Sequence, residues 1–253
     1  MTQAATTPDQ ARERLCLALD VPNLGVALRI AEDVSPFVGW VKVGLQLYTA
    51  YGPEAVLPFR FFGQRVFLDL KLHDIPNTVA SAVPEIAGLG AELVNVHALG
   101  GRDMIAAAVA AADQWSGRFD KPRPKILAVT LLTSLGQSDI AELMASDRSP
   151  EDLTLQLAMV AREAGADGVV ASPAETLALR AALGSDFLIV TPGIREQSDV
   201  PDDQQRTATV AGAIAAGSDL LVIGRPILRS PNRRAAARTI RDTVAQTLES
   251  QVA

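Results

Sequence analysis

Two opposite charges, Asp69 and Lys71, stand at the end of the apolar run 66–70. Because side chains alternate along a strand, these two project to one face and leave Leu68 and Leu70 on the other. Opposite charges at the end of a core strand are costly to bury unless they pair or take part in chemistry. One interpretation is a plain structural ion pair. The functional interpretation is a reactive lysine held by a carboxylate, since charges in this position usually face a ligand in α/β folds.

A second carboxylate, Asp74, follows Lys71 by three residues. Carboxylates on both sides keep an ammonium group protonated, which favours Lys71 as an acid. The alternative is a Schiff-base lysine of the aldolase type, which needs a lowered pKa. Lys42 projects from another strand and is expected to pair with Asp69 and Asp20, giving an alternating array of lysines and aspartates.

Metal binding has little support in the sequence. The chain has two histidines and one cysteine, too few ligands of that type for a transition-metal site. The three carboxylates Asp20, Asp69 and Asp74 could in principle hold Mg²⁺. His97 ends a strand and is interpreted as a structural histidine hydrogen-bonded at the barrel rim, because no second ligand is spaced to join it.

Short apolar runs alternate with helical segments along the whole chain. The pattern predicts an α/β fold with a single (β/α)8 TIM-barrel domain over residues 1–253, in which residues 1–12 form a poorly ordered extension. The expected strands are 15–19, 40–44, 66–70, 93–96, 125–129, 168–170, 187–190 and 220–223. The expected helices are 24–32, 53–61, 78–87, 104–112, 139–144, 153–164, 174–182 and 232–249.

The polar residues of interest all fall where these strands end, which is the catalytic face of such a barrel. Gly224 and Arg225 end the eighth strand, where barrels often bind phosphate through backbone N–H groups. The Arg225 guanidinium matches phosphate oxygens. The long polar segment 193–206 is typical of a lid, and Arg195 lies within it. The alternative for Arg195 is a solvated loop arginine.

Composition and charge narrow the function classes. The 253 residues carry a net charge of −6 and no basic run, which argues against general nucleic-acid binding. An anionic substrate would therefore need local positive groups. The single cysteine, Cys16, is expected in the core, and one cysteine suits a reducing compartment. No signal peptide or membrane-length apolar run is found, so we expect a cytoplasmic protein without membrane association.

The segment 69–78 matches the signature Asp-x-Lys-x-x-Asp-Ile-Pro-x-Thr, and the chain resembles the bacterial orotidine 5′-phosphate decarboxylases. Related sugar-phosphate decarboxylases and aldolases share the Asp-x-Lys-x-x-Asp core, so it is the Ile-Pro-Asn-Thr tail that narrows the resemblance to the orotidine 5′-phosphate decarboxylases. The resemblance extends nearly end to end, in the family's order. It also covers Leu19-Asp20, Val41-Lys42-Val43-Gly44, Thr130-Leu131-Leu132-Thr133-Ser134, Thr191-Pro192-Gly193-Ile194-Arg195 and Val222-Ile223-Gly224-Arg225.

The resemblance implies a homodimer that converts orotidine 5′-phosphate to UMP and CO₂, the last step of de novo UMP synthesis, without cofactor or metal. It implies that Lys71 protonates the C6 carbanion within a catalytic array of Lys42, Asp69, Lys71 and Asp74. Asp74 and Thr78 would reach the site of the neighbouring subunit. The implied substrate-binding residues are Asp20, Lys42, Asp69, Thr78, Thr133, Pro192, Arg195, Gln204, Gly224 and Arg225.

Three further alternatives stay open from the sequence. A Mg²⁺-dependent 3-keto-L-gulonate 6-phosphate decarboxylase, or a related hexulose-phosphate aldolase, would share the Asp-x-Lys-x-x-Asp core. A catalytically dead barrel could bind nucleotide as a sensor, although the intact Asp69, Lys71 and Asp74 argue against it. For Thr133, the alternative to a contact with the pyrimidine ring is a helix cap near Ser134 and Gly136.

Overall fold

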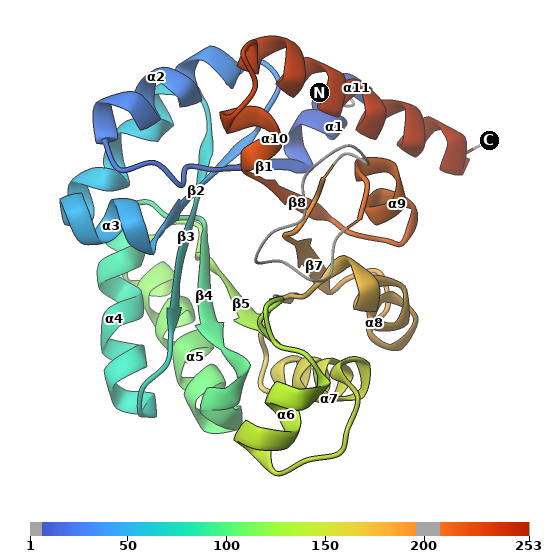
Figure 1. Ribbon diagram of the computed structural model, residues 1–253. Helices are drawn as coiled ribbons and strands as arrows, with labels where there is room; N and C mark the ends of the chain where they lie inside the picture. The colour runs from blue at the N-terminus through green and yellow to red at the C-terminus, as the bar shows by residue number, and fades with distance from the viewer. Residues whose placement is uncertain (1–6, 196–207, 253) are drawn as a thin grey trace.

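Eight parallel strands close into a barrel in the computed structural model, each strand pairing with the next along the chain and the eighth with the first (Figure 1). The structure describes residues 7–195 and 208–252. The predicted (β/α)8 barrel is therefore confirmed. The strands are β1 (Leu15–Ala18), β2 (Trp40–Gly44), β3 (Arg65–Leu72), β4 (Leu93–His97), β5 (Lys125–Val129), β6 (Gly168–Val170), β7 (Leu188–Thr191) and β8 (Leu220–Ile223).

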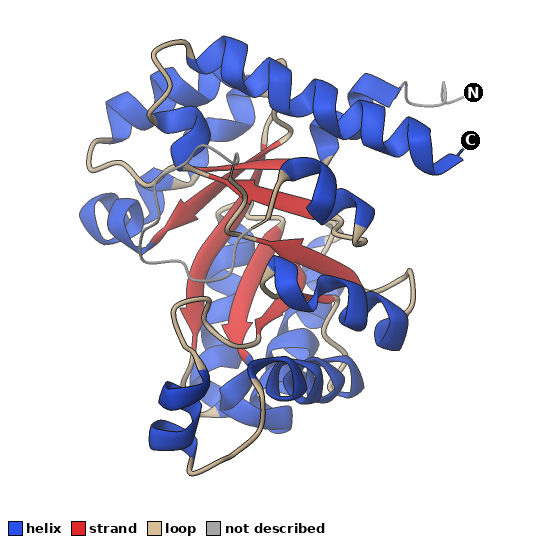
Figure 2. Ribbon diagram, turned by 45° about the vertical axis from the view of Figure 1, so that its right-hand side comes forward, coloured by secondary structure: helices blue, strands red, loops and turns tan. Residues whose placement is uncertain are grey.

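Helices surround the barrel and cover the outer face of its strands (Figure 2). The α-helices are α1 (Thr7–Glu13), α2 (Leu24–Val34), α3 (Leu45–Tyr51), α4 (Pro76–Gly88), α5 (Gly101–Phe119), α6 (Gln137–Met144), α7 (Pro150–Glu163), α8 (Thr176–Leu183), α9 (Val210–Ala215), α10 (Arg225–Leu228) and α11 (Arg233–Val252). The 3₁₀ helices are η1 (Gly52–Ala55), η2 (Leu57–Phe62), η3 (Ala98–Gly100) and η4 (Pro173–Glu175). No helix within the described ranges is long and apolar enough to cross a membrane.

The strands are buried on both faces, which explains why they read as continuous apolar runs. One buried cluster, containing Cys16, Trp40 and Phe67, fills the inside of the barrel. A larger cluster packs between the barrel and the helices, and it includes strand residues that face outward, such as Leu17 and Val41. The prediction of Cys16 as a core residue is confirmed, since its thiol is buried and free.

The region after β2 differs from the prediction of a helix over 53–61. The α-helix comes earlier, as α3, and the 3₁₀ helices η1 and η2 follow it. Pro53 and Pro58 each lie in the first turn of one of these 3₁₀ helices. Proline has no N–H to donate within a helix, so each one starts a new short turn instead of continuing an α-helix.

The N-terminal stretch is more ordered than expected. Residues from Thr7 onward form α1, which packs against α11, so the expectation of a poorly ordered extension is wrong for 7–12. The first six residues lie outside the described part. Ala11 is fully buried, and the Arg12 guanidinium donates to the carbonyls of Ser35 and Gly63. These long-range contacts stabilise a helix of seven residues, which would be marginal alone.

Candidate active site

A cavity of about 870 Å³ opens at the carboxyl ends of the strands. The candidate site residues are predicted at this end of the barrel, because they follow the strands in the sequence. Nine of the predicted site residues line it together, although they come from six different strand ends: Asp20, Lys42, Asp69, Lys71, Thr133, Pro192, Arg195, Gly224 and Arg225. The apolar part of the lining includes Val129, Leu131 and Ile194.

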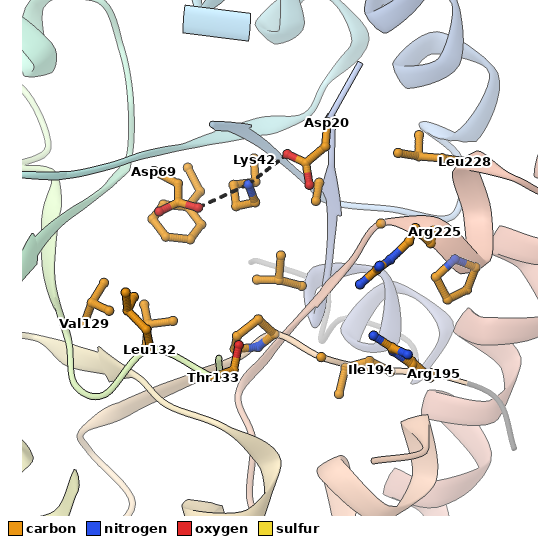
Figure 3. A pocket seen from close by; sticks show the side chains of 18 of the residues that line it. Asp20, Lys42, Asp69, Val129, Leu132, Thr133, Ile194, Arg195, Arg225 and Leu228 are labelled. Carbon is orange, nitrogen blue, oxygen red and sulfur yellow. Dashed lines mark hydrogen bonds and ion pairs between the residues drawn. The ribbon is translucent and has the colours of Figure 1, made fainter. Parts of the chain in front are cut away.

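Asp69 lies at the centre of a charged array. Its Oδ1 is 2.7 Å from the Lys71 ammonium, and its Oδ2 is 3.1 Å from that of Lys42. Lys42 continues the array to Asp20, whose Oδ1 is 3.3 Å from Nζ (Figure 3). Each oxygen of the Asp69 carboxylate thus meets a different lysine, and the alternating pairing expected for these four side chains is present.

Burial and charge act in opposite directions on this array. Burial acts to raise the pKa of Asp69, but Lys42 and then Lys71 outweigh it, so that the pKa is lowered to about 2. Burial acts to lower the pKa of Lys42, but the carboxylates of Asp69 and Asp20 outweigh it and raise that pKa above its ordinary value. Asp69 and Lys42 therefore stay ionised at neutral pH.

Asp74 and Thr78 lie apart from this array within one chain. Both are exposed, and neither lines the cavity. The Asp74 carboxylate accepts a hydrogen bond from the backbone N–H of Ile75 at 2.7 Å. Within the chain, then, Lys71 is paired with Asp69 but not with Asp74, contrary to the expectation of carboxylates on both sides. A role for Asp74 and Thr78 in a neighbouring subunit stays a prediction.

Arginines occupy a different part of the cavity. Arg195 follows β7 and Arg225 follows β8, and both side chains point into the cavity across from Lys42 and Asp69 (Figure 3). Arg195 is half-buried and lines the cavity, and its role as a phosphate ligand stays a prediction. The rest of the expected lid, residues 196–206, lies outside the described residues, and so does Gln204.

Thr133 lines the cavity rather than capping a helix. Helix α6 begins at Gln137 with Gly136 as its N-cap residue, and the Asp139 carboxylate accepts from the Gly136 N–H at 2.8 Å. The helix-cap alternative for Thr133 is therefore wrong. Its position leaves the hydroxyl free for the role that the resemblance implies, which stays a prediction.

The sequence reasoning missed one polar residue beside the array, Asn95 on β4. Its amide contacts both Asp69 and Lys71. The only signal in the sequence is a single amide inside the apolar strand Leu93–His97. His97 does lie at the rim as expected, where its Nδ1 accepts from the Leu99 N–H at 3.3 Å and its ring stacks on His73.

Metal ligands are not gathered in the described part of the chain. Residues 7–195 and 208–252 contain no group of three or more His, Cys, Asp or Glu side chains that could hold a metal ion. The three carboxylates considered for Mg²⁺ do not converge here, because Asp74 lies outside the cavity that Asp20 and Asp69 line. The Asp20 and Asp69 carboxylates are instead bridged by the ammonium of Lys42.

The fold and the cavity together define a (β/α)8-barrel protein with a lysine–aspartate site at the carboxyl ends of its strands. The sequence model of one family matches residues 13–240. The chain belongs to the orotidine 5′-phosphate decarboxylase / HUMPS family.

Similar proteins agree with this assignment. The orotidine 5′-phosphate decarboxylase of Moorella thermoacetica is 46% identical over 230 residues, which cover 91% of each chain. That of Geobacter metallireducens is 50% identical over 234 residues, which cover 92% of this chain and 97% of the relative. A crystal structure of the Lactobacillus acidophilus orotidine 5′-phosphate decarboxylase superposes with a TM-score of 0.79 at 35% identity, covering 92% of this chain and 99% of that one. The resemblance to the bacterial enzymes is confirmed.

Proposed function

We propose that this chain converts orotidine 5′-phosphate to UMP and CO₂ in pyrimidine biosynthesis, with Lys71 as the proton donor. The observation that carries the proposal is the Lys71 ammonium, held 2.7 Å from a buried, ionised Asp69 inside the barrel cavity. The relatives named orotidine 5′-phosphate decarboxylase, at 46% and 50% identity, support the choice of substrate.

The array suits a reaction that develops negative charge on carbon. When the bond between C6 and the carboxylate breaks, CO₂ leaves and the electron pair stays on C6. The Lys71 ammonium stabilises that charge and then transfers a proton from Nζ to C6. Lys71 is left neutral and regains a proton from solvent. Asp69 holds the ammonium in place, and its low pKa keeps it an acceptor throughout.

The rest of the cavity is assigned to substrate binding. Asp20 and Lys42 would bind the ribose hydroxyls, whereas Thr133 and Pro192 would contact the pyrimidine. Arg195, Gly224 and Arg225 would bind the phosphate, with Gln204 from the segment outside the described residues. Binding energy from a remote phosphate can be used to lower the barrier at the reacting carbon. The cavity volume of about 870 Å³ lies in the range typical of small-molecule sites.

We propose a homodimer in which Asp74 and Thr78 complete the site of the partner subunit. The supporting observation is the exposure of the whole stretch 73–78, with the Ile75 side chain 67% exposed. An exposed aliphatic residue in the middle of the signature is suited to a protein interface. We also propose a cytoplasmic location, for which the free thiol of Cys16 is suited to a reducing compartment.

The test follows the loss of orotidine 5′-phosphate absorbance with purified protein, with and without EDTA. Turnover that is unaffected by EDTA is expected. No turnover, or Mg²⁺-dependent turnover of a sugar phosphate such as 3-keto-L-gulonate 6-phosphate, would move the chain to the other branch of its family. Tight UMP binding without any turnover would instead support a nucleotide sensor.

A further inference from the structure

The pairing of β3 with β4 is interrupted at the catalytic residues. The register runs Phe67 with Leu93 and Leu68 with Val94, and it resumes at Leu72 with Val96. Between these points β3 has more residues than β4, so β3 bulges out of the ladder. Lys71 lies in this bulge with a φ of 52°, in the left-handed region that residues other than glycine rarely adopt.

The side chain of Asn95 fills the place of the missing ladder partner. Its Oδ1 accepts a hydrogen bond from the Lys71 backbone N–H at 2.8 Å. Its Nδ2 donates to Asp69 Oδ1 at 2.7 Å. The same Asp69 oxygen accepts from the Lys71 ammonium at 2.7 Å. The three residues therefore form a closed ring of hydrogen bonds that includes both the backbone and the side chain of Lys71.

We propose that Asn95 is a positioning residue for the proton transfer, holding the Lys71 backbone and the Asp69 carboxylate in one fixed relation. This inference rests on the proposed function. Asn95 is 1% exposed and does not line the cavity, so it acts through its two neighbours and not on the substrate. A neutral amide of this length supplies one acceptor and one donor at once, which is what the ring requires.

The partners of the two Asn95 hydrogen bonds distinguish a positioning role from a general packing role. Inside the barrel, the residue paired with Asn95 on β5 is the apolar Leu127, and Leu93 also faces the interior. A buried amide among such residues is costly unless its polar atoms are bonded. Both bonds of Asn95 go to the Lys71–Asp69 pair, so the amide is satisfied only when that pair has the observed geometry.

The first test is Asn95→Leu, which keeps the approximate volume and removes both hydrogen bonds. We expect kcat for orotidine 5′-phosphate to fall about 100-fold, because small displacements of a catalytic group have effects of that order. KM and the Kd for UMP should change less than about threefold, since Asn95 is outside the cavity. A normal kcat, or a loss confined to KM, would overturn the proposal.

A second variant, Asn95→Asp, gives a readout that a structural role would not move. A protonated carboxyl can still accept from the Lys71 N–H and donate to Asp69, whereas the ionised form would face the Asp69 carboxylate with a like charge. We expect kcat of this variant to rise as pH falls, on a limb that the wild type and Asn95→Leu lack. A pH profile identical to that of the wild type would contradict the proposal.

The matched control is Gln64→Leu. Gln64 is another buried amide, whose Nε2 donates to the Val38 carbonyl at 3.2 Å at the opposite end of β3. Thermal unfolding of all variants reports on folding, and Gln64→Leu should leave kcat within about twofold. An equal loss of kcat in Gln64→Leu and Asn95→Leu would show that any buried amide matters, which would also overturn the proposal.

Titration of the Asp69 carboxyl carbon by NMR separates this inference from the proposed function, because it needs no substrate. Loss of the Asn95 donor should raise the pKa of Asp69 in Asn95→Leu relative to the wild type. If the wild type fails to decarboxylate orotidine 5′-phosphate but the titration moves, the proposed function fails and the positioning role stands. If the wild type is active and neither kcat nor the titration changes in Asn95→Leu, the positioning role fails.

Discussion

Replacement of Asp69 by asparagine tests the charged array directly. The substitution keeps the shape of the side chain but removes the charge that lies between the ammonium groups of Lys42 and Lys71. In the folded protein these lysines lower the Asp69 pKa from 3.8 to about 2. Because a tenfold change in proton affinity corresponds to about 1.4 kcal/mol, the ionised carboxylate contributes roughly 2 kcal/mol to stability at neutral pH.

The sign of the pH dependence follows from the lowered pKa. The contribution of Asp69 is complete well above 3.8, the pKa of the unfolded state, and it is lost as pH falls through the folded value of about 2. About half of it should be lost by pH 3. The difference in unfolding free energy between wild type and Asp69→Asn should therefore shrink on acidification.

Urea unfolding of both proteins from pH 7 down to pH 3 measures this difference. Asp147→Asn, which changes an exposed carboxylate after α6, is the matched control and should show no such trend. A stability difference between wild type and Asp69→Asn that stays constant over this range would refute the electrostatic reasoning. Turnover of Asp69→Asn should also fall by at least about 100-fold, because the Lys71 ammonium loses its partner.

Three further predictions concern catalysis, binding and assembly. Lys71→Ala should abolish turnover while the Kd for UMP, measured by calorimetry, changes only a few-fold; near-normal turnover would disprove its role as proton donor. Arg225→Ala should raise KM for orotidine 5′-phosphate about tenfold or more, because a charge-assisted contact to phosphate is lost. Turnover of orotidine, which lacks the phosphate, should be unchanged, and equal losses on both substrates would contradict the assignment. Ile75→Glu should dissociate the dimer in sedimentation experiments and lower turnover on dilution; an intact, fully active dimer would exclude Ile75 from the interface.

Much of the fold could be read from local patterns. Strands buried on both faces must be apolar runs, and eight of these alternating with helical segments left few topologies open. The signature over 69–78 could also be recognised from the sequence, because the residues that define it lie close together along the chain. The error over 53–61 was local too, since Pro53 and Pro58 disfavour the α-helix that was expected there.

The tertiary structure decided which side chains meet. Asp20 follows β1 and Arg225 follows β8, and the two line one cavity because the barrel closes by pairing these first and last strands. The left-handed backbone of Lys71 donates its N–H to the side chain of Asn95 from the next strand, a contact that no spacing within β3 could indicate. Likewise, Asp74 belongs to the signature yet lies outside the cavity of its own chain. Strand periodicity fixes the face on which a side chain lies, whereas the register between strands fixes its partners, and that register is set by long-range packing.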